Sequence, residues 1–306
     1  MSVLYFFESI RCPVLDFFFG AITYLGSEIG LIVLALLFFW CIDKREGYYL
    51  FLVGFIGTLF NQFLKILCRV PRPWVLDPTF RPVESAIEGA TGYSFPSGHT
   101  QASVGLFGGI AYGTKRRRVR ALCLVLCVLV PLSRMYLGVH TPLDVLASVG
   151  LALLLILLLR PLVRVEDARR MACLLGGATA LSVGYLLFVL LFPFPADTDP
   201  VNLAEAVKNA YTLLGVLLGL DLAYFADARY KILDTAAPTA GQILKYLLGL
   251  AIALGIKEGL KAPLSALLGR DVQNAVRYFL LVVFAGILWP LTFRFFKKIG
   301  KKKTAQ

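Results

Sequence analysis

Long apolar stretches recur along the whole chain and constrain its fold more than any other feature. A helix that crosses a membrane needs about 20 mainly apolar residues, because its backbone polar groups must be satisfied inside hydrocarbon. Only 16% of the 306 residues are charged, whereas soluble domains carry about 25%. The sequence therefore predicts an all-α, polytopic integral membrane bundle. The predicted spans are 27–42, 48–69, 99–113, 121–138, 141–160, 171–192, 207–225, 241–261 and 274–295.

The N-terminal residues differ from these spans. Residues 3–19 place Glu8, Arg11 and Asp16 between apolar side chains, which favours a helix lying in the membrane interface; a short tilted span is the alternative. The same charges argue against a cleavable signal. We expect three parts, which are an interfacial helix at 1–26, a six-helix core at 27–193 with its functional residues in 65–144, and additional spans with a basic tail at 194–306.

The net charge of +12 comes mainly from short runs of Lys and Arg between apolar segments. Such runs mark cytoplasmic loops in membrane proteins, so we expect no nucleic-acid partner. Nine spans that start outside and end inside place the basic segments 43–47, 115–120, 160–170 and 226–235 and the tail Lys297–Lys303 in the cytoplasm. The six cysteines lie in or beside apolar segments without metal-ligand spacing, so neither a disulfide nor a metal site is expected.

Both histidines of the chain lie between Lys65 and Asp144. The topology above places the proline-rich loop 70–98 and the turn containing His140 on the same, outer side of the membrane. His99 follows Ser97 and Gly98 at the start of a predicted span, where unpaired backbone N–H groups favour an anion. An ordinary Ser N-cap is the alternative. An imidazole beside an anion can transfer protons near neutral pH.

Three cations and one carboxylate accompany the histidines. Lys65 can extend its ammonium to the interface, Arg72 can be solvated in its loop, and Arg134 is ordinary at a membrane edge. Asp144 has a structural role as well, because Thr141-Pro142-Leu143-Asp144 can form a capping box at the start of a span. Its functional alternative is to accept the Nδ1–H of His140 and so direct Nε2 toward a substrate.

The order and spacing of these residues are more specific than any one of them. Lys65-x6-Arg72-Pro73, Pro96-Ser97-Gly98-His99 and Ser133-Arg134-x5-His140-x3-Asp144 together resemble the three-part signature of the type 2 phosphatidic acid phosphatases, also called the lipid phosphate phosphatase superfamily. The flanking segments 24–28 and 39–43 resemble the sphingosine-1-phosphate phosphatase branch and bacterial proteins similar to it. The resemblance covers residues 20–165, and residues 166–306 carry none of the motifs.

The resemblance implies a role for each matched position. His140 would attack phosphorus to give a phosphohistidine, and Asp144 would hold its ring. His99 would protonate the departing alkoxide and later help to activate water. The phosphoryl oxygens would be bound by Lys65, Arg72, Ser97, Gly98 and Arg134. Three cations and helix-end amides can stabilise the charge of a phosphoryl transition state, so we expect neither a metal nor another cofactor.

The function implied is removal of phosphate from a lipid at a membrane surface. The substrate could be phosphatidate, lysophosphatidate, a sphingoid-base phosphate, phosphatidylglycerol phosphate or a polyprenyl pyrophosphate. We expect a bacterial inner (plasma) membrane, with the site facing the outer, periplasmic side. The alternative is a non-catalytic lipid-phosphate binding protein or transporter, because the C-terminal spans and Asp221 within them are not needed for hydrolysis. Those spans could form a lipid groove or the face of a homodimer.

Overall fold

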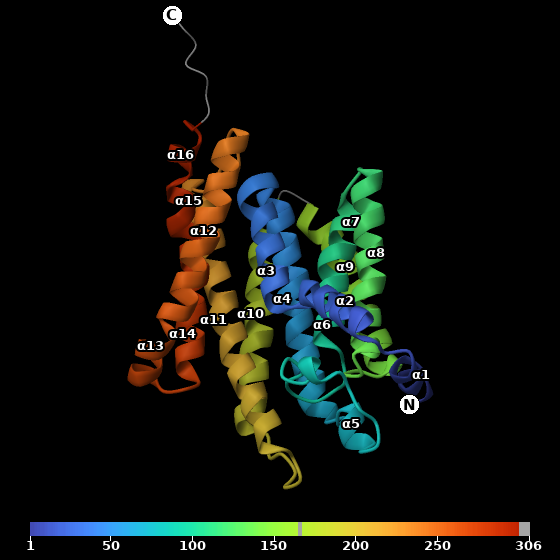
Figure 1. Ribbon diagram of the computed structural model, residues 1–306. Helices are drawn as coiled ribbons and strands as arrows, with labels where there is room; N and C mark the ends of the chain where they lie inside the picture. The colour runs from blue at the N-terminus through green and yellow to red at the C-terminus, as the bar shows by residue number, and fades with distance from the viewer. Residues whose placement is uncertain (165–166, 300–306) are drawn as a thin grey trace, which may run out of the picture. The chain divides into compact units, whose positions relative to one another are not determined.

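The computed structural model describes residues 1–164 and 167–299, and every regular element in them is helical (Figure 1). In this part of the chain seven helices are long and apolar enough to cross a membrane. An eighth span is formed if the bent pair Pro13–Gly26 and Glu28–Ile42, which meet at 55°, is counted as one. The predicted polytopic helical membrane fold is confirmed. The seven helical spans are Lys44–Leu76, Arg117–Tyr136, Pro142–Val163, Ala168–Leu191, Pro200–Tyr230, Thr239–Leu268 and Val272–Leu291.

The predicted span 99–113 is a short, composite helix. It consists of α6 (Gly98–Ser103), one π-helical turn (Val104–Gly108) and α7 (Gly109–Gly113), and is shorter than the ~20 residues of a full crossing. Figure 1 shows it lying along α8 (Arg117–Tyr136), against which all three pieces pack. Its first turn carries part of the predicted site, so its packing positions that site.

The chain forms two compact units. The first contains Met1–Ile32, Leu50–Pro161 and Leu191–Ala206, and the second contains Val33–Tyr49, Leu162–Leu190 and Val207–Gln306. Parts of two predicted basic segments, residues 165–166 and residues 300–306, lie outside the described residues. Every predicted site residue belongs to the first unit.

Within the first unit, α4 (Lys44–Cys68) lies very close to α6. A Cβ added at Gly57 would be 1.6 Å from Nε2 of Gln101. Gln101 is fully buried and donates from Nε2 to Val53 O at 3.4 Å. Glycine is therefore needed at position 57, because any side chain there would displace the glutamine from its hydrogen bond to Val53 on α4.

The N-terminal residues form two helices, α1 (Ser2–Ser9) and α2 (Pro13–Thr23). The break between them precedes Pro13, which has no N–H to continue a helix and suits a first helical position. Their charged groups turn toward the protein. Arg11 donates from Nε to Tyr136 O at 3.3 Å, and Asp16 accepts from the Tyr136 hydroxyl at 2.7 Å, while Phe17 is 80% exposed. The polar face of this segment is therefore used in packing against α8.

The second unit contains α10 (Ala168–Leu191), most of α11 (Pro200–Tyr230), α12 (Thr239–Gly259), α13 (Lys261–Leu268), α14 (Val272–Val283), α15 (Trp289–Leu291) and α16 (Phe293–Phe296). Lys245 of α12 is fully buried and donates to Trp40 O at 2.8 Å and Thr235 O at 3.1 Å. Its ammonium also lies 4.3 Å from the centre of the Phe293 ring. Backbone carbonyls and an aromatic face thus satisfy this buried cation.

Candidate active site

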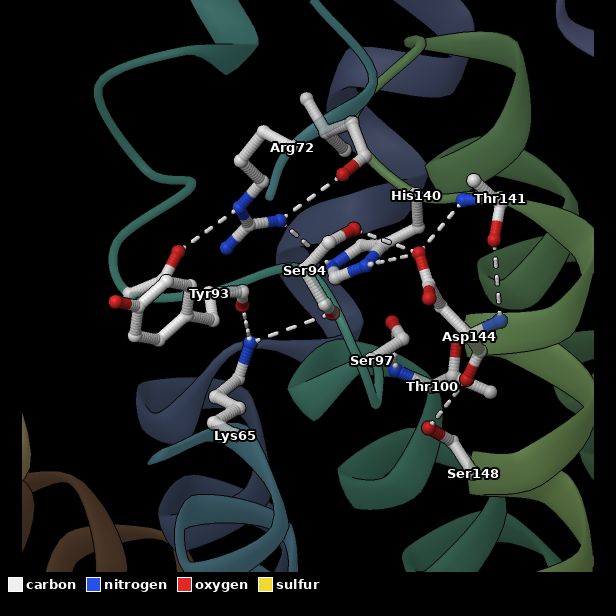
Figure 2. Close-up of polar contacts among 12 residues, drawn as sticks. Lys65, Arg72, Tyr93, Ser94, Ser97, Thr100, His140, Thr141, Asp144 and Ser148 are labelled. Atoms are coloured by element: carbon white, nitrogen blue, oxygen red, sulfur yellow. Dashed lines mark hydrogen bonds and ion pairs between the residues drawn. The ribbon is translucent and has the colours of Figure 1, made fainter. Parts of the chain in front are cut away.

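The predicted site residues belong to one region of the first unit, and Figure 2 shows five of them, namely Lys65, Arg72, Ser97, His140 and Asp144. Lys65, Arg72 and Arg134 lie close enough for their charges to act on the rings of both His99 and His140. Of the eight residues, Lys65 lies on α4, and Arg72 directly precedes α5 (Pro73–Leu76). Ser97, Gly98 and His99 form the start of α6. Arg134 lies at the end of α8, His140 in the turn after it, and Asp144 in the first turn of α9 (Pro142–Arg164).

His140 is held as a neutral imidazole with its Nε2 lone pair facing Arg72. The Arg72 Nη1 group lies 3.1 Å from Nε2; because arginine only donates, Nε2 must accept and the ring proton is assigned to Nδ1. Burial and the positive charges of Arg72, Arg134 and Lys65 hold the pKa of His140 well below its ordinary value of 6.5. The imidazole is therefore available as a nucleophile at neutral pH.

Asp144 lies beside the other ring nitrogen. Its Oδ2 atom is 3.4 Å from Nδ1 of His140, yet Nδ1 forms no hydrogen bond within the described part of the chain. The contact is thus electrostatic in this structure, and the predicted Nδ1–H bond to the carboxylate is not formed. The predicted capping box is confirmed, since Thr141 N donates to Asp144 Oδ2 at 2.8 Å and Asp144 N donates to Thr141 Oγ1 at 3.3 Å.

Ser94 is a third group bound to the same carboxylate, and no sequence motif indicated it. Its side chain is fully buried, and its hydroxyl donates to Asp144 Oδ2 at 2.6 Å. Figure 2 shows this hydroxyl approaching Asp144 from the loop that precedes α6. A serine in a loop is too common to be singled out. Ser94 contacts Asp144 because the loop before α6 packs against the first turn of α9.

Backbone carbonyls of residues 91–94 hold two of the cations. Arg72 donates from Nη2 to Thr91 O at 2.7 Å and from Nε to Gly92 O at 3.0 Å. Lys65 donates to the carbonyls of Tyr93 and Ser94. Both side chains are buried, and among the described residues neither makes an ion pair. Their charges are oriented without being neutralised, which leaves them available to an anion.

The start of α6 supplies the helix-end amides that the sequence predicted. Ser97 is the N-cap, and its Oγ accepts from Thr100 N at 3.4 Å. Ser97 N donates to Asp144 O at 3.2 Å, which ties this helix end to α9. The first backbone N–H groups of a helix have no partner within it. Ser97 therefore acts as an ordinary N-cap, and its hydrogen bonds also orient the first amides of α6 in the site.

Arg134 is anchored by the N-terminal segment. Its Nη1 atom donates to Thr23 Oγ1 at 2.8 Å, while its Nε atom has no partner although the side chain is only 3% exposed. A Cβ added at Gly26 would lie 2.8 Å from His99 O. The residues around α2 therefore support two site residues, which no motif in the N-terminal sequence indicated.

In the described part of the chain, no group of three or more His, Cys, Asp or Glu side chains is arranged to hold a metal ion. The cysteines at 12, 41, 68, 123, 127 and 173 all have free thiols. The polar groups of the site are instead cations, imidazoles, hydroxyls and one carboxylate. This set favours an anionic ligand with several acceptor oxygens.

Several curated proteins are similar to this chain. Sphingosine-1-phosphate phosphatase 1 of Mus musculus is 26% identical over 279 residues, which are 82% of this chain and 63% of the relative. Phosphatidylglycerophosphatase B of Bacillus subtilis is 31% identical over 166 residues, 49% of this chain and 76% of the relative. Undecaprenyl-diphosphatase BcrC of the same bacterium is 30% identical over 144 residues, 46% of this chain and 72% of the relative.

The chain spans about three fifths of the length of the mammalian sphingosine-1-phosphate phosphatases that it matches. No solved structure matches it. Residues 46–167 match the model of the PAP2 superfamily, and residues 211–302 match the model described as PAP2 superfamily phosphatase, transmembrane extension. The likeness thus continues beyond the motif-bearing region, into the C-terminal spans. Together with the bacterial relatives, these matches show that the chain belongs to the PAP2 superfamily.

Proposed function

We propose that this protein is a membrane-embedded phosphatase that hydrolyses a lipid phosphate through a phosphohistidine on His140. The observation that carries the proposal is the geometry around the Nε2 lone pair of that ring. It faces the guanidinium of Arg72 at 3.1 Å, and the charges of Arg72, Arg134 and Lys65 all act on the ring. A phosphoryl group attracted to these cations is brought against a neutral nucleophile.

In the first step, the substrate phosphate accepts hydrogen bonds from donors that are bonded to protein acceptors in this structure. The Arg72 Nη1 group moves from Nε2 to a phosphoryl oxygen, which frees the lone pair. Nε2 then attacks phosphorus, the N–P bond forms and the ester P–O bond breaks. The bound phosphate offsets the charges of Lys65, Arg72 and Arg134 that act on the His99 ring, so His99 takes up a proton in the complex. It gives this proton to the alkoxide that departs from a phosphomonoester, and the lipid leaves as a neutral alcohol. Asp144, 3.4 Å from Nδ1, stabilises the positive charge that develops on the His140 ring.

In the second step, the phosphohistidine is hydrolysed. The now neutral His99 accepts a proton from a water molecule as that water attacks phosphorus. The N–P bond breaks, its electron pair returns to Nε2, and inorganic phosphate leaves. The three cations and the first amides of α6 stabilise the charge on the phosphoryl oxygens in both steps.

The substrate class follows from the membrane setting and from the relatives. The printed names of those relatives refer to sphingosine-1-phosphate, phosphatidylglycerophosphate and undecaprenyl diphosphate. These share a phosphate or pyrophosphate at the headgroup of an apolar molecule. We therefore propose a lipid phosphomonoester or pyrophosphate as the substrate, and a panel of such lipids as the means of identifying it.

The test uses the full chain purified in detergent. We expect phosphate release from at least one lipid of the panel with EDTA present, inhibition by vanadate, and loss of release in His140→Ala. A radiolabelled substrate should leave an acid-labile label on the wild-type protein and none on that variant. Undiminished turnover by His140→Ala would refute the nucleophile assignment. Lipid binding without any phosphate release would indicate the non-catalytic binding protein instead.

We propose further that the site faces the outer side of a bacterial inner membrane. The support is the distribution of Lys and Arg over the predicted loops. In intact cells, a single cysteine introduced within residues 80–90 should react with an impermeant thiol reagent, and one at 116–118 should not. The native cysteines are first replaced by serine, so that only the introduced thiol reports. Reversed labelling would place the site on the cytoplasmic side.

A further inference from the structure

One face of α4 runs along α6 toward the predicted phosphate site. Gly57 lies against Gln101, and one helical turn later Asn61 lies against Gly98, where an added Cβ would be 3.7 Å from Asn61 Oδ1. After another turn, Lys65 reaches the carbonyls of Tyr93 and Ser94. Positions separated by four share a helix face. Asn61 therefore lies beside the N-terminus of α6, on the face of α4 that also carries Lys65.

The Asn61 side chain has no hydrogen-bond partner among residues 1–164 and 167–299. It is 1% exposed, and neither Nδ2 nor Oδ1 is bonded to a group of these residues. Leaving a buried carboxamide unsatisfied is costly, so such a group requires an explanation. Hydrophobic packing provides none, because leucine would fill a similar volume without that cost.

Other unpartnered buried atoms occur in the same region. Among the described residues they include Oγ1 of Thr100, Oε1 of Gln101 and Nε of Arg134. Arg134 is predicted to bind the phosphoryl group. The site as a whole thus has unused donors and acceptors, as expected where a polar ligand completes the hydrogen bonding.

We propose that Asn61 is a further catalytic residue, whose Nδ2 group donates a hydrogen bond to the phosphoryl oxygen that is also bound by Gly98 N–H. The assignment rests on the proposed function. Its position supports this role in either orientation of the amide, since turning the carboxamide by 180° exchanges Nδ2 and Oδ1. A neutral donor also suits a position beside Lys65, because it binds the anion without adding a fourth positive charge to the group.

The test compares Asn61→Leu with wild type in detergent. Removing a donor to a charged group should lower kcat/KM and weaken vanadate binding by about 10- to 100-fold. If Asn61 only fills space, activity and vanadate binding should be kept. The unfolding temperature without vanadate should be unchanged or higher under either role, because a buried unsatisfied amide is removed, so it serves as the check that the variant is folded. Asn61→Asp, nearly identical in shape, should lose more than Asn61→Leu because its carboxylate repels the phosphate.

The matched control is Gln62→Leu. This position is half-buried and lies about 100° further round α4, so its kcat/KM and vanadate affinity should stay at wild-type values. Vanadate binding is measured separately by its effect on the unfolding temperature. If wild type binds vanadate but hydrolyses no lipid phosphate, the proposed function fails. The hydrogen bond from Asn61 to the anion is still tested, by the vanadate affinity of the Asn61 variants. If both folded Asn61 variants bind vanadate as wild type does, the Asn61 proposal is wrong. If wild type itself binds no vanadate, the proposed function and the Asn61 proposal are both overturned.

Discussion

Replacing Asp144 by asparagine should separate the catalytic role of this residue from its structural one. Asp144 Oδ2 accepts from Ser94 Oγ at 2.6 Å and from Thr141 N at 2.8 Å. An asparagine oxygen at the same place can accept both bonds. The capping box should therefore survive, and we expect a loss of only about 1–2 kcal/mol in the free energy of unfolding.

The effect on catalysis should be much larger. In the resting state the His140 ring is neutral, so the charge of Asp144 acts on it fully only when the ring becomes positive during attack on phosphorus. Two unit charges 3.4 Å apart interact by about 5 kcal/mol at an effective dielectric constant of about 20. Because the asparagine oxygen retains part of this stabilisation, we expect a loss of about 3–5 kcal/mol. That corresponds to a decrease in kcat of about 10² to 10⁴.

The assay measures phosphate release in detergent, with the thermal unfolding temperature of each variant recorded alongside. Asp167→Asn is the matched control. This carboxylate caps α10, with Oδ1 accepting from Arg169 N at 2.9 Å and Arg170 N at 3.3 Å, and it lies outside the site. Its kcat should remain at the wild-type value. A folded Asp144→Asn protein with kcat within about threefold of wild type would refute the electrostatic argument.

Four other variants or conditions test the site. Arg72→Lys keeps the charge but cannot reproduce the guanidinium bonds, so kcat/KM for phosphate release should fall about 100-fold. Because the pKa of His140 is held well below 6.5, kcat/KM corrected for substrate ionisation should not decrease as pH falls through 6.5; a decrease with an apparent pKa of 6.5 or above would contradict this. His99→Ala should impair an alkyl phosphate more than p-nitrophenyl phosphate, whose leaving group needs no proton; equal losses would remove the general-acid role. Gly57→Ala should lower the unfolding temperature by overpacking, and adding Gln101→Ala should restore it.

Two structural features of the candidate site could be predicted from the sequence because their signals are local. Thr141 and Asp144 are three residues apart, and the capping box depends only on that spacing and on the start of a helix. The same holds for Ser97 as the N-cap of α6. The spans themselves were predictable for an equally simple reason, since hydrocarbon requires apolar residues over a full helical length. The composite helix from Gly98 to Gly113 was recognised by its composition, although it is too short for a full crossing.

The residues that the sequence did not indicate act through tertiary contacts. Thr23 bonds to Arg134, and Ser94 bonds to Asp144; each pair joins segments 50 or more positions apart. Asn61 is an unremarkable polar residue within an apolar helix until α6 is packed against it. The charges of the first helices predict a polar face, and the sequence did not indicate that Arg11 and Asp16 of this face bond to Tyr136. Pattern alone cannot distinguish a polar face toward water from one that packs on another helix.

The way in which the cations are held explains how the site can bind an anion and remain ordered without one. Carboxylate partners would orient Lys65 and Arg72 equally well, but they would neutralise both charges and compete with a phosphoryl group. The carbonyls of residues 91–94 orient the same donors and leave the net charge positive. Burying such charges unpaired is unfavourable, so an incoming phosphate is stabilised both by new hydrogen bonds and by relief of this repulsion. Replacing a residue of the 91–94 loop by proline should therefore weaken vanadate binding without altering any charge, because it displaces the carbonyls that direct the cations.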